Sequence, residues 1–345
     1  MNNISTEKSL FNASFLIILM GSLGDVARGL CVATHINKNL PGSKITWLIE
    51  PKWVELIDFH PYIDNVIVFN RVWNIFGVVG LYRKLKKEHF DITLDLQRHI
   101  KSGFFSFLSR AKRRIGFNRH DSKELNWIFN NERIDCFGED LPKFLHYLKF
   151  LHYLGLPETD TVDFGLSSFD PAPYLPDDID TIKEPYIAIV IGSSWQSKDW
   201  FLEHYVELIS NILTSGKYSV VLLGDKSKQG LAKSISNQIH SNSLLNMVNK
   251  TSLLELVATL KRASAAVGPD SGPGHLAAAV GTPYVSLFGP TPPNRVAPYG
   301  CEHLVIQSSA KCAPCNKKRC ADHQEHCMRL ITAKEVFAKL DEILL

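Results

Sequence analysis

The stretch AAVGPDSGPGHLAAAVGTPYVSLFGPTPPNRVAPYG, residues 265–300, decides the fold class of this chain. Its first four residues are small and apolar, as in a buried strand, and the Gly-Pro-Gly run at 272–274 separates them from the alanine-rich run at 276–280. Pro suits the first turn of a helix and Gly the position after its end, so Gly281 marks where the helix stops. The stretch therefore predicts a strand, a glycine-rich turn, a helix, a second strand and a polar loop.

The turn before this helix has the groups expected of an anion-binding site. Free backbone N–H groups at a helix start, together with the helix dipole, favour a bound negative charge. Asp270, Ser271 and His275 surround that start and suit a phosphorylated sugar. A second loop, 288–291, follows the next strand, and α/β folds bind ligands at the carboxyl ends of neighbouring strands. The alternative is that Asp270 and Ser271 cap the helix and His275 is a core residue.

Residues 270–293, DSGPGHLAAAVGTPYVSLFGPTPP, resemble the signature segment of glycosyltransferase family 9. These are the heptosyltransferases that extend the lipopolysaccharide inner core from ADP-heptose. The resemblance covers nearly the whole chain. It implies an α/β fold of the GT-B architecture, with two Rossmann-like domains whose parallel sheets face a central cleft. It also implies inverting glycosyl transfer that requires no cofactor.

The composition is that of a globular protein with room for two domains. The chain has 345 residues, of which 45% are hydrophobic and 21% are charged. A net charge of +3 gives no reason to expect a nucleic acid partner. Basic residues nevertheless cluster at Arg110, Lys112, Arg113, Arg114, Arg119 and Lys123. This cluster is either a solvated face or a contact for an acidic acceptor or an anionic membrane surface.

The apolar run at 15–20 predicts a buried strand. It is too short to span a bilayer and ends in the turn GSLGD at 21–25. The polar residues before it do not resemble a signal peptide. We therefore expect a cytoplasmic protein, in peripheral contact with the cytoplasmic face of the inner membrane.

Asp25 is the candidate general base. It lies where the first strand passes into a helix predicted over 26–36, so its carboxylate either caps the helix or faces a ligand. The run Ser22-Leu23-Gly24-Asp25 matches the S-x-G-D turn of the heptosyltransferases, whose aspartate is assigned the role of base. The resemblance also makes Ser22 and Gly24 acceptor-binding residues.

Alternating strands and helices predict a parallel sheet in the first half of the chain. Strands are expected at 45–49, 66–69 and 91–96, and helices at 80–87 and 141–154. Residues 95–102 resemble the acceptor-side loop of the family, and the acceptor-binding residues are then Gln97, Arg98, His99 and Lys101. Basic groups there would pair with phosphate or carboxylate groups of a lipid A–Kdo type acceptor.

A segment rich in Ser, Pro and Asp divides the chain. We predict an N-terminal acceptor-binding domain over 1–168, a linker over 169–185, a C-terminal nucleotide-sugar donor-binding domain over 186–330 and a C-terminal helix over 331–345. In the donor domain, strands are expected at 186–191 and 219–223, and helices at 201–213 and 253–260.

The turn after the strand at 186–191 is rich in Gly and Ser and precedes a helix, which suits a phosphate group. By the resemblance, two hydroxyl residues and a lysine that bind the donor diphosphate correspond to Ser193, Ser194 and Lys198. The alternative for Lys198 is an ordinary surface lysine without a role in binding. Asp225 matches an acidic residue near the nucleotide ribose. The donor-binding residues are thus Ser193, Ser194, Lys198, Asp225, Asp270, Ser271, Gly272, Gly274 and His275.

Four of the seven cysteines, Cys312, Cys315, Cys320 and Cys327, lie within sixteen residues. Four thiolates at such spacing can form a tetrahedral site for structural zinc or iron. Free thiols are the alternative, because disulfides do not persist in a reducing compartment. The transfer chemistry requires no metal.

The prediction is therefore an inverting glycosyltransferase that uses an ADP-sugar donor, with Kdo or heptose as the acceptor. A different nucleotide sugar, or a binding protein without catalysis, is the alternative. An NAD-dependent oxidoreductase is disfavoured because the turn after the first strand lacks the G-x-G-x-x-G pattern.

Overall fold

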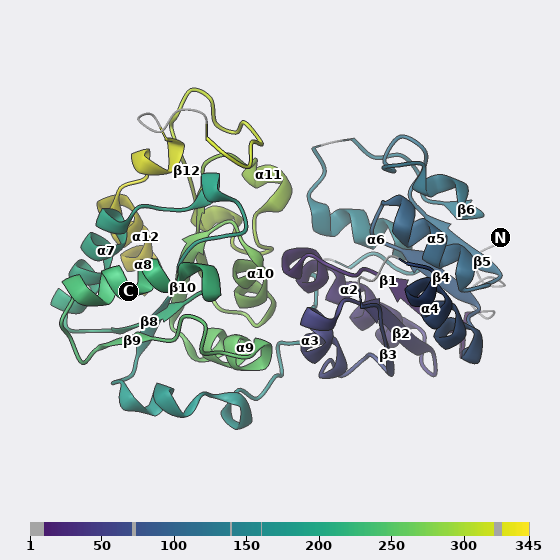
Figure 1. Cartoon of the computed structure of the whole chain (residues 1–345), viewed down its shortest axis with the longest axis horizontal. Helices are drawn as coiled ribbons and strands as arrows, with labels where there is room; N and C mark the ends of the chain where they lie inside the picture. Colours follow the sequence, from purple (N-terminus) through teal and green to yellow (C-terminus); the bar gives the residue numbers. More distant parts are fainter. Residues whose placement is uncertain (1–9, 71–73, 139, 160, 321–325, 345) are drawn as a thin grey trace. The chain divides into compact units, whose positions relative to one another are not determined.

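The computed structural model describes residues 10–70, 74–138, 140–159, 161–320 and 326–344. The chain forms two compact units, Met1–Ser167 and Ser168–Leu345 (Figure 1). Each unit contains one six-stranded sheet whose strand pairs are all parallel. The predicted α/β fold with parallel sheets is confirmed.

The sheet of unit 1 has the order β3-β2-β1-β4-β5-β6. Its strands are β1 (Ser14–Ile18), β2 (Lys44–Ile49), β3 (Asn65–Val68), β4 (Ile92–Asp95), β5 (Arg113–Gly116) and β6 (Glu132–Arg133). The central strands β1 and β4 are buried almost completely, as expected for a parallel sheet covered on both faces.

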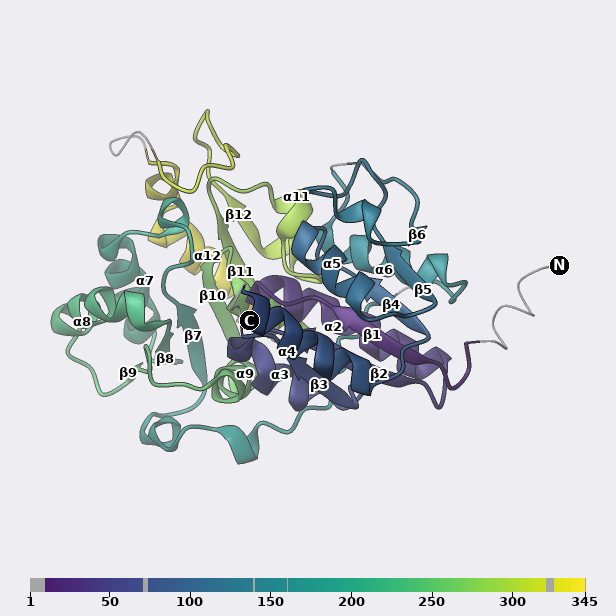
Figure 2. The same ribbon diagram turned by 45° about the vertical axis from the view of Figure 1, so that its right-hand side comes forward.

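Helices cover both faces of this sheet. They are α2 (Leu23–Asn39), α3 (Val54–Asp58), α4 (Ile75–Lys87), α5 (Ile100–Leu108) and α6 (Lys143–Tyr153). Helices α4 and α5 share one hydrophobic cluster with the sheet, to which Leu85 and Phe105 contribute. Helix α6 packs against α2. Figures 1 and 2 both show α4 and α5 on the same side of the sheet.

The sheet of unit 2 has the order β12-β11-β10-β7-β8-β9, which repeats the winding of unit 1. Its strands are β7 (Tyr186–Val190), β8 (Ser219–Leu223), β9 (Leu244–Asn246), β10 (Ala265–Pro269), β11 (Tyr284–Phe288) and β12 (Val305–Gln307). Its helices are α7 (Leu202–Thr214), α8 (Gln229–Gln238), α9 (Leu253–Arg262), α10 (Gly272–Ala279), α11 (Pro293–Val296) and α12 (Ala333–Leu344).

The strand order fixes where a ligand can bind in each unit. The chain winds outward in one direction from β1 and in the other from β4, and likewise from β7 and β10. Helices that leave neighbouring strands on opposite sides open a crevice at the carboxyl ends of these strands. The turns after β1, β4, β7 and β10 therefore lie at the two positions where side chains can converge on a ligand.

Segment 169–185, predicted to be the linker, belongs to unit 2 and contains the 3-10 helices η3 (Ala172–Tyr174) and η4 (Asp177–Thr181). Within the described ranges, no helix combines the length and the apolar character needed to cross a bilayer.

Candidate functional site

In unit 1, the turns after β1 and β4 are bonded to each other through Gln97. The Gln97 side chain accepts a hydrogen bond from the Met20 amide at 2.6 Å and donates to the Gly21 carbonyl at 2.8 Å. Both ends of its amide group are therefore used to hold the turn that leads into α2. Gln97, which is predicted to bind the acceptor, thus also fixes the backbone next to Asp25.

Asp25 lies in the first turn of α2, and its side chain is 23% exposed. The Ser22 hydroxyl donates to one carboxylate oxygen of Asp25 at 2.9 Å. The Arg28 guanidinium, one helical turn along, contacts the other oxygen at 2.6 Å. Because α2 places residues three apart on the same side, Arg28 meets the carboxylate from within its own helix.

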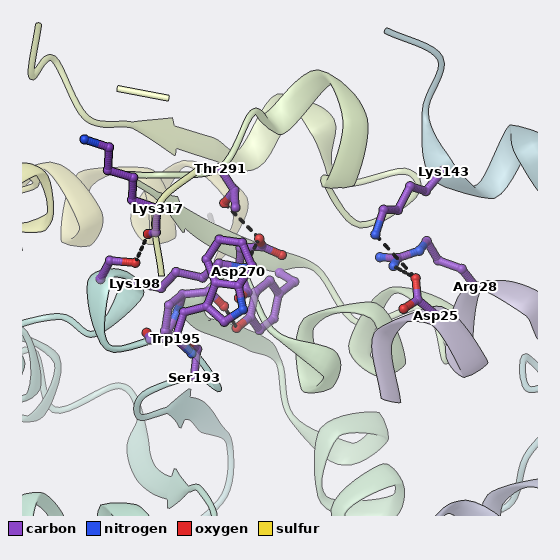
Figure 3. A network of polar contacts seen from close by, with 12 residues as sticks. Asp25, Arg28, Lys143, Ser193, Trp195, Lys198, Asp270, Thr291 and Lys317 are labelled. Atoms are coloured by element: carbon purple, nitrogen blue, oxygen red, sulfur yellow. Dashed lines mark hydrogen bonds and ion pairs between the residues drawn. The ribbon is translucent and has the colours of Figure 1, made fainter. Parts of the chain in front are cut away.

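Helix α6 brings two more groups to the same carboxylate. The Lys143 ammonium lies 3.5 Å from one Asp25 oxygen (Figure 3). The Tyr147 hydroxyl donates to the same oxygen at 3.4 Å. Burial alone would raise the pKa of Asp25, but the attraction of Arg28 and Lys143 outweighs burial and holds this pKa well below its usual range. Burial and the neighbouring Asp25 carboxylate raise the pKa of Tyr147. Asp25 is thus an ionised, partly exposed carboxylate within a cationic setting.

The other predicted acceptor residues surround the start of α5. The Arg98 side chain donates to the Asp121 carbonyl, and its guanidinium lies 5.3 Å from the centre of the Phe117 ring. His99 is the residue before α5 and lies 3.4 Å from Glu124. The Lys101 ammonium lies 5.6 Å from the centre of the Phe69 ring. Gly24 is buried within α2.

In unit 2, the turns after β7 and β10 are joined by a buried ion pair. The Lys198 ammonium contacts the Asp270 carboxylate at 2.6 Å, and the two side chains are 11% and 9% exposed (Figure 3). The Thr291 hydroxyl donates to the same carboxylate oxygen at 2.9 Å. Asp270 therefore links three loops at one edge of the sheet, and it does not act as a helix cap. Lys198 is not a surface lysine.

The loop after β7 is held by a second ion pair. Asp199 accepts a hydrogen bond from the Ser193 amide at 2.9 Å and contacts the Lys228 ammonium at 2.5 Å. Gly192 has a φ of +75°, and a Cβ atom there would lie 2.1 Å from the Lys228 side chain. Glycine is required here because its backbone is in the left-handed region and because a side chain would collide with Lys228. Ser194 is exposed in the same loop.

The start of α10 points its free amides into the same edge. Ser271 is the residue before the helix, and its hydroxyl oxygen is buried with no hydrogen-bond partner among the described residues. Gly272 opens the helix, and Gly274 packs so closely that a Cβ atom would lie 2.6 Å from the Tyr284 ring. His275 is buried in the helix. A buried hydroxyl beside free amides is suited to an anionic oxygen.

Asp225 lies after β8 and is exposed. Its carboxylate accepts hydrogen bonds from the amide and hydroxyl of Ser227, at 2.8 and 2.5 Å, and so caps the 3-10 helix η6 (Lys226–Lys228). These contacts are those of a capping residue at the carboxyl end of a strand.

The prediction of a four-cysteine metal site is not supported. In the parts of the chain that the structure describes, no group of three or more His, Cys, Asp or Glu side chains is placed to hold a metal ion. Cys312 is exposed whereas Cys327 is buried, and Cys315 and Cys320 are partly exposed. Burial and the neighbouring thiols of Cys312, Cys315 and Cys320 raise the pKa of Cys327 to about 11, so the four thiols lie near one another but are not arranged as metal ligands among the described residues. The segment is bonded to the loops after β7 and β11, because the Lys317 carbonyl accepts from the Ser197 hydroxyl at 2.6 Å and the Asn316 amide donates to the Pro290 carbonyl at 2.7 Å.

Several residues in these networks were assigned no individual role by the sequence analysis. They are Arg28, Lys143, Tyr147, Asp199, Lys228 and Thr291. Arg28 follows Asp25 at helical spacing, which is a signal that sequence reasoning could have used. Lys143 and Tyr147 meet Asp25 through tertiary packing of α6 on α2, which leaves no local pattern.

Three comparisons relate the chain to known proteins. A model of glycosyltransferase family 9 (heptosyltransferase) matches residues 78–326. The lipopolysaccharide core heptosyltransferase OpsX of Haemophilus influenzae is 30% identical over 290 residues, which are 83% of this chain and 82% of that protein. Lipopolysaccharide heptosyltransferase 1 of Pseudomonas aeruginosa is 28% identical over 317 residues, 88% of this chain and 86% of that protein. Among solved structures, E. coli heptosyltransferase WaaC with ADP has a TM-score of 0.80 at 22% identity and covers 96% of this chain and 98% of its own.

Proposed function

Because this chain belongs to glycosyltransferase family 9, the heptosyltransferases, and is therefore a glycosyltransferase, we propose that it transfers heptose from ADP-heptose to the lipopolysaccharide inner core. One observation carries this proposal. The two predicted sets of residues, around Asp25 and around Lys198 and Asp270, each lie where the winding of their sheet reverses. Such positions bind the ligands of α/β enzymes.

Unit 1 would supply the base. Asp25 takes the proton of an acceptor hydroxyl, whose oxygen forms the new bond to the anomeric carbon while the bond to the diphosphate breaks and ADP leaves with its electron pair. General-base catalysis of this kind contributes about 10²–10⁴-fold. Arg28, Lys143 and Ser22 keep the carboxylate ionised and fixed in orientation, so it can accept the proton.

Unit 2 would hold the donor. The free amides at the start of α10 and the Ser271 hydroxyl offer hydrogen bonds to the diphosphate, and Lys198 adds a positive charge next to them. These donors stabilise negative charge as it develops on the leaving ADP. Ser193 and Ser194 lie in the adjoining loop, and Asp225 at the next strand end would contact the ribose.

The acceptor would approach the turns after β1 and β4. Arg98, His99 and Lys101 lie at the start of α5 and carry the cationic or hydrogen-bonding groups that an anionic sugar needs. Kdo and a first heptose are both candidate acceptors. Because this acceptor is anchored in lipid, we also propose that the chain works as a peripheral protein at the cytoplasmic face of the inner membrane.

The test is product analysis by mass spectrometry with ADP-heptose and either a Kdo-terminated or a heptose-terminated lipid A acceptor. The expected result is a mass increase of one heptose on one of the two acceptors. Asp25→Asn should lower turnover about 10²–10⁴-fold and leave ADP binding almost unchanged. Asp58→Asn, at an exposed position of α3, is the matched control and should behave like the parent chain. Full turnover by Asp25→Asn would refute the role of Asp25 as base, and ADP binding without transfer to either acceptor would favour a non-catalytic binding protein.

A further inference from the structure

Large apolar side chains are exposed almost exclusively on unit 1. Of the ten such residues among those described, nine belong to this unit, and Leu330 belongs to unit 2. Seven of the nine lie on α4, on α5 or next to the 3-10 helix η2 (Asn126–Ile128), which packs against α5. They are Ile75, Phe76, Val79, Ile100, Phe107, Leu125 and Ile128. We call these seven residues, on elements that pack on the same side of the sheet, the α4–α5 face.

The exposed residues of α4 are held in an ordered helix. Asn74 caps the helix by accepting a hydrogen bond from the Gly77 amide at 2.8 Å, and Leu81 and Leu85 anchor the opposite side in the core. Ile75 and Phe76 are nevertheless 72% and 82% exposed. A monomeric protein seldom exposes adjacent large apolar groups without a partner.

The sequence around this face is strongly basic. Residues 74–133 contain thirteen Lys and Arg against six Asp and Glu, a net charge of +7, while the whole chain carries +3. The remainder of the chain is therefore net negative. Arg83, Lys84, Lys86 and Lys87 are exposed in the later turns of α4. The guanidinium of Arg114, on β5, lies 5.9 Å from the centre of the ring of Phe107, which is exposed on α5.

This combination favours a lipid surface over a second copy of the chain. A symmetric dimer through the α4–α5 face would place two basic faces against each other, because the same patch is used on both subunits. An anionic bilayer instead offers negative headgroups to the basic residues and a hydrocarbon boundary to the apolar ones. Aromatic and aliphatic groups flanked by Lys and Arg are the pattern of helices that lie in a membrane interface.

We propose that the α4–α5 face docks unit 1 on an anionic bilayer, with Ile75, Phe76 and Phe107 entering the interface. The inference rests on the proposed function, because a lipid-anchored acceptor brings the reaction to a membrane. The face lies on the side of the sheet covered by α4 and α5, and α5 begins next to the predicted acceptor residues (Figure 2). Docking would therefore present that loop to an acceptor held in the same bilayer.

Sedimentation with vesicles tests the proposal without donor or acceptor. The full chain should bind vesicles of phosphatidylethanolamine and phosphatidylglycerol, should bind phosphatidylcholine vesicles far less, and should dissociate as salt rises. Phe76→Ser should weaken binding about tenfold, and Lys86→Glu with Lys87→Glu should weaken it about a hundredfold. Leu330→Ser, which removes an apolar group that is 49% exposed on unit 2, is the matched control and should bind like the parent chain.

Several results would overturn the proposal. They are equal binding to both kinds of vesicle, an equal loss with Leu330→Ser, or concentration-dependent dimerisation that Phe76→Ser abolishes while vesicle binding persists. Transfer to a deacylated, water-soluble acceptor separates this proposal from the proposed function. Phe76→Ser should keep its turnover in that assay. Transfer without vesicle binding would refute the docking face alone, and vesicle binding by a chain that transfers no sugar would refute the function alone.

Discussion

Asp25 is subject to two opposing influences. Its partial burial favours the protonated carboxyl, whereas Arg28, Lys143 and the Ser22 hydroxyl favour the carboxylate. The cations win, and the group is therefore ionised at any pH at which an enzyme is assayed. These cations also make Asp25 a weaker base, because a carboxylate of low pKa accepts a proton less readily. A bound acceptor that draws Lys143 toward its own anionic groups would raise the pKa of Asp25 again.

Lys143→Met should raise the pKa of Asp25 toward its ordinary value, because one of the two cations that lower it is removed. We expect the pKa of the Asp25 carboxyl, followed by NMR titration, to rise by about one pH unit. Lys149→Met, which changes a partly exposed lysine of the same helix, should leave this pKa unchanged. An unchanged Asp25 titration in Lys143→Met would contradict the assigned contact.

The same variant should change the response of stability to acid. The Asp25 pKa is lower in the folded than in the unfolded chain, so its contacts stabilise the fold above the ordinary carboxyl pKa of 3.8 and are lost as pH falls below it. Lys143→Met should therefore lose less of its free energy of unfolding on acidification than the parent does. Urea unfolding across that range measures this difference.

Two variants of the Lys198–Asp270 pair distinguish its contribution to the free energy of unfolding from its contribution to ADP binding. Lys198→Met leaves a buried carboxylate without its cation and should lower the free energy of unfolding by about 3–5 kcal/mol. Adding Asp270→Asn removes that uncompensated charge and should restore much of the stability. ADP affinity, measured by calorimetry, should stay low in both variants. Recovery of ADP binding by the double variant would mean that Lys198 serves the fold and not the donor.

At the scale of single elements, the loop after β7 is shaped by Gly192. Gly192→Ala would force a left-handed backbone on alanine and push the Lys228 side chain out of its contact with Asp199. Gly216 also has a positive φ, of +67°, but no atom lies within 4 Å of a Cβ placed there. Gly216→Ala should cost about 1–2 kcal/mol for the backbone alone. Gly192→Ala should lower the free energy of unfolding by about 1–3 kcal/mol more than Gly216→Ala does, as measured by thermal unfolding. Equal losses in the two variants would show that the Lys228 side chain moves aside without cost.

The elements differ in how well the sequence predicts them. Strands such as β7 and β8 are short runs of buried, mostly aliphatic residues that a Gly soon follows, a pattern that predicts both their type and their place. β9 and β12 have three residues each and too little periodicity to be predicted. The Lys198 and Asp270 loops follow strong strands and could be found, whereas Lys143 reaches Asp25 across 118 positions of sequence. The cysteine spacing predicted a metal site, but in the described part of the chain no group of side chains is arranged to hold a metal ion.

At the scale of the whole molecule, each unit has a complete sheet, and no described strand pair joins residues on both sides of the boundary at Ser167 and Ser168. A chimera that carries unit 1 of the Haemophilus influenzae relative before this unit 2 should therefore fold. We expect its acceptor preference to follow unit 1 and its ADP affinity to match the parent chain. Acceptor preference that follows unit 2 would contradict the division of roles.

The repeated winding order also bears on how such proteins diversify. The described strands of each sheet form hydrogen bonds only within that sheet. A substitution that reshapes a turn at the edge of one sheet therefore leaves the other sheet intact. Under the proposed division of roles, selection can then change the acceptor through unit 1 while unit 2 keeps its nucleotide site, or the reverse. Because each sheet is complete in itself, a change in the glycan that such an enzyme makes would require substitutions in only one of the two units.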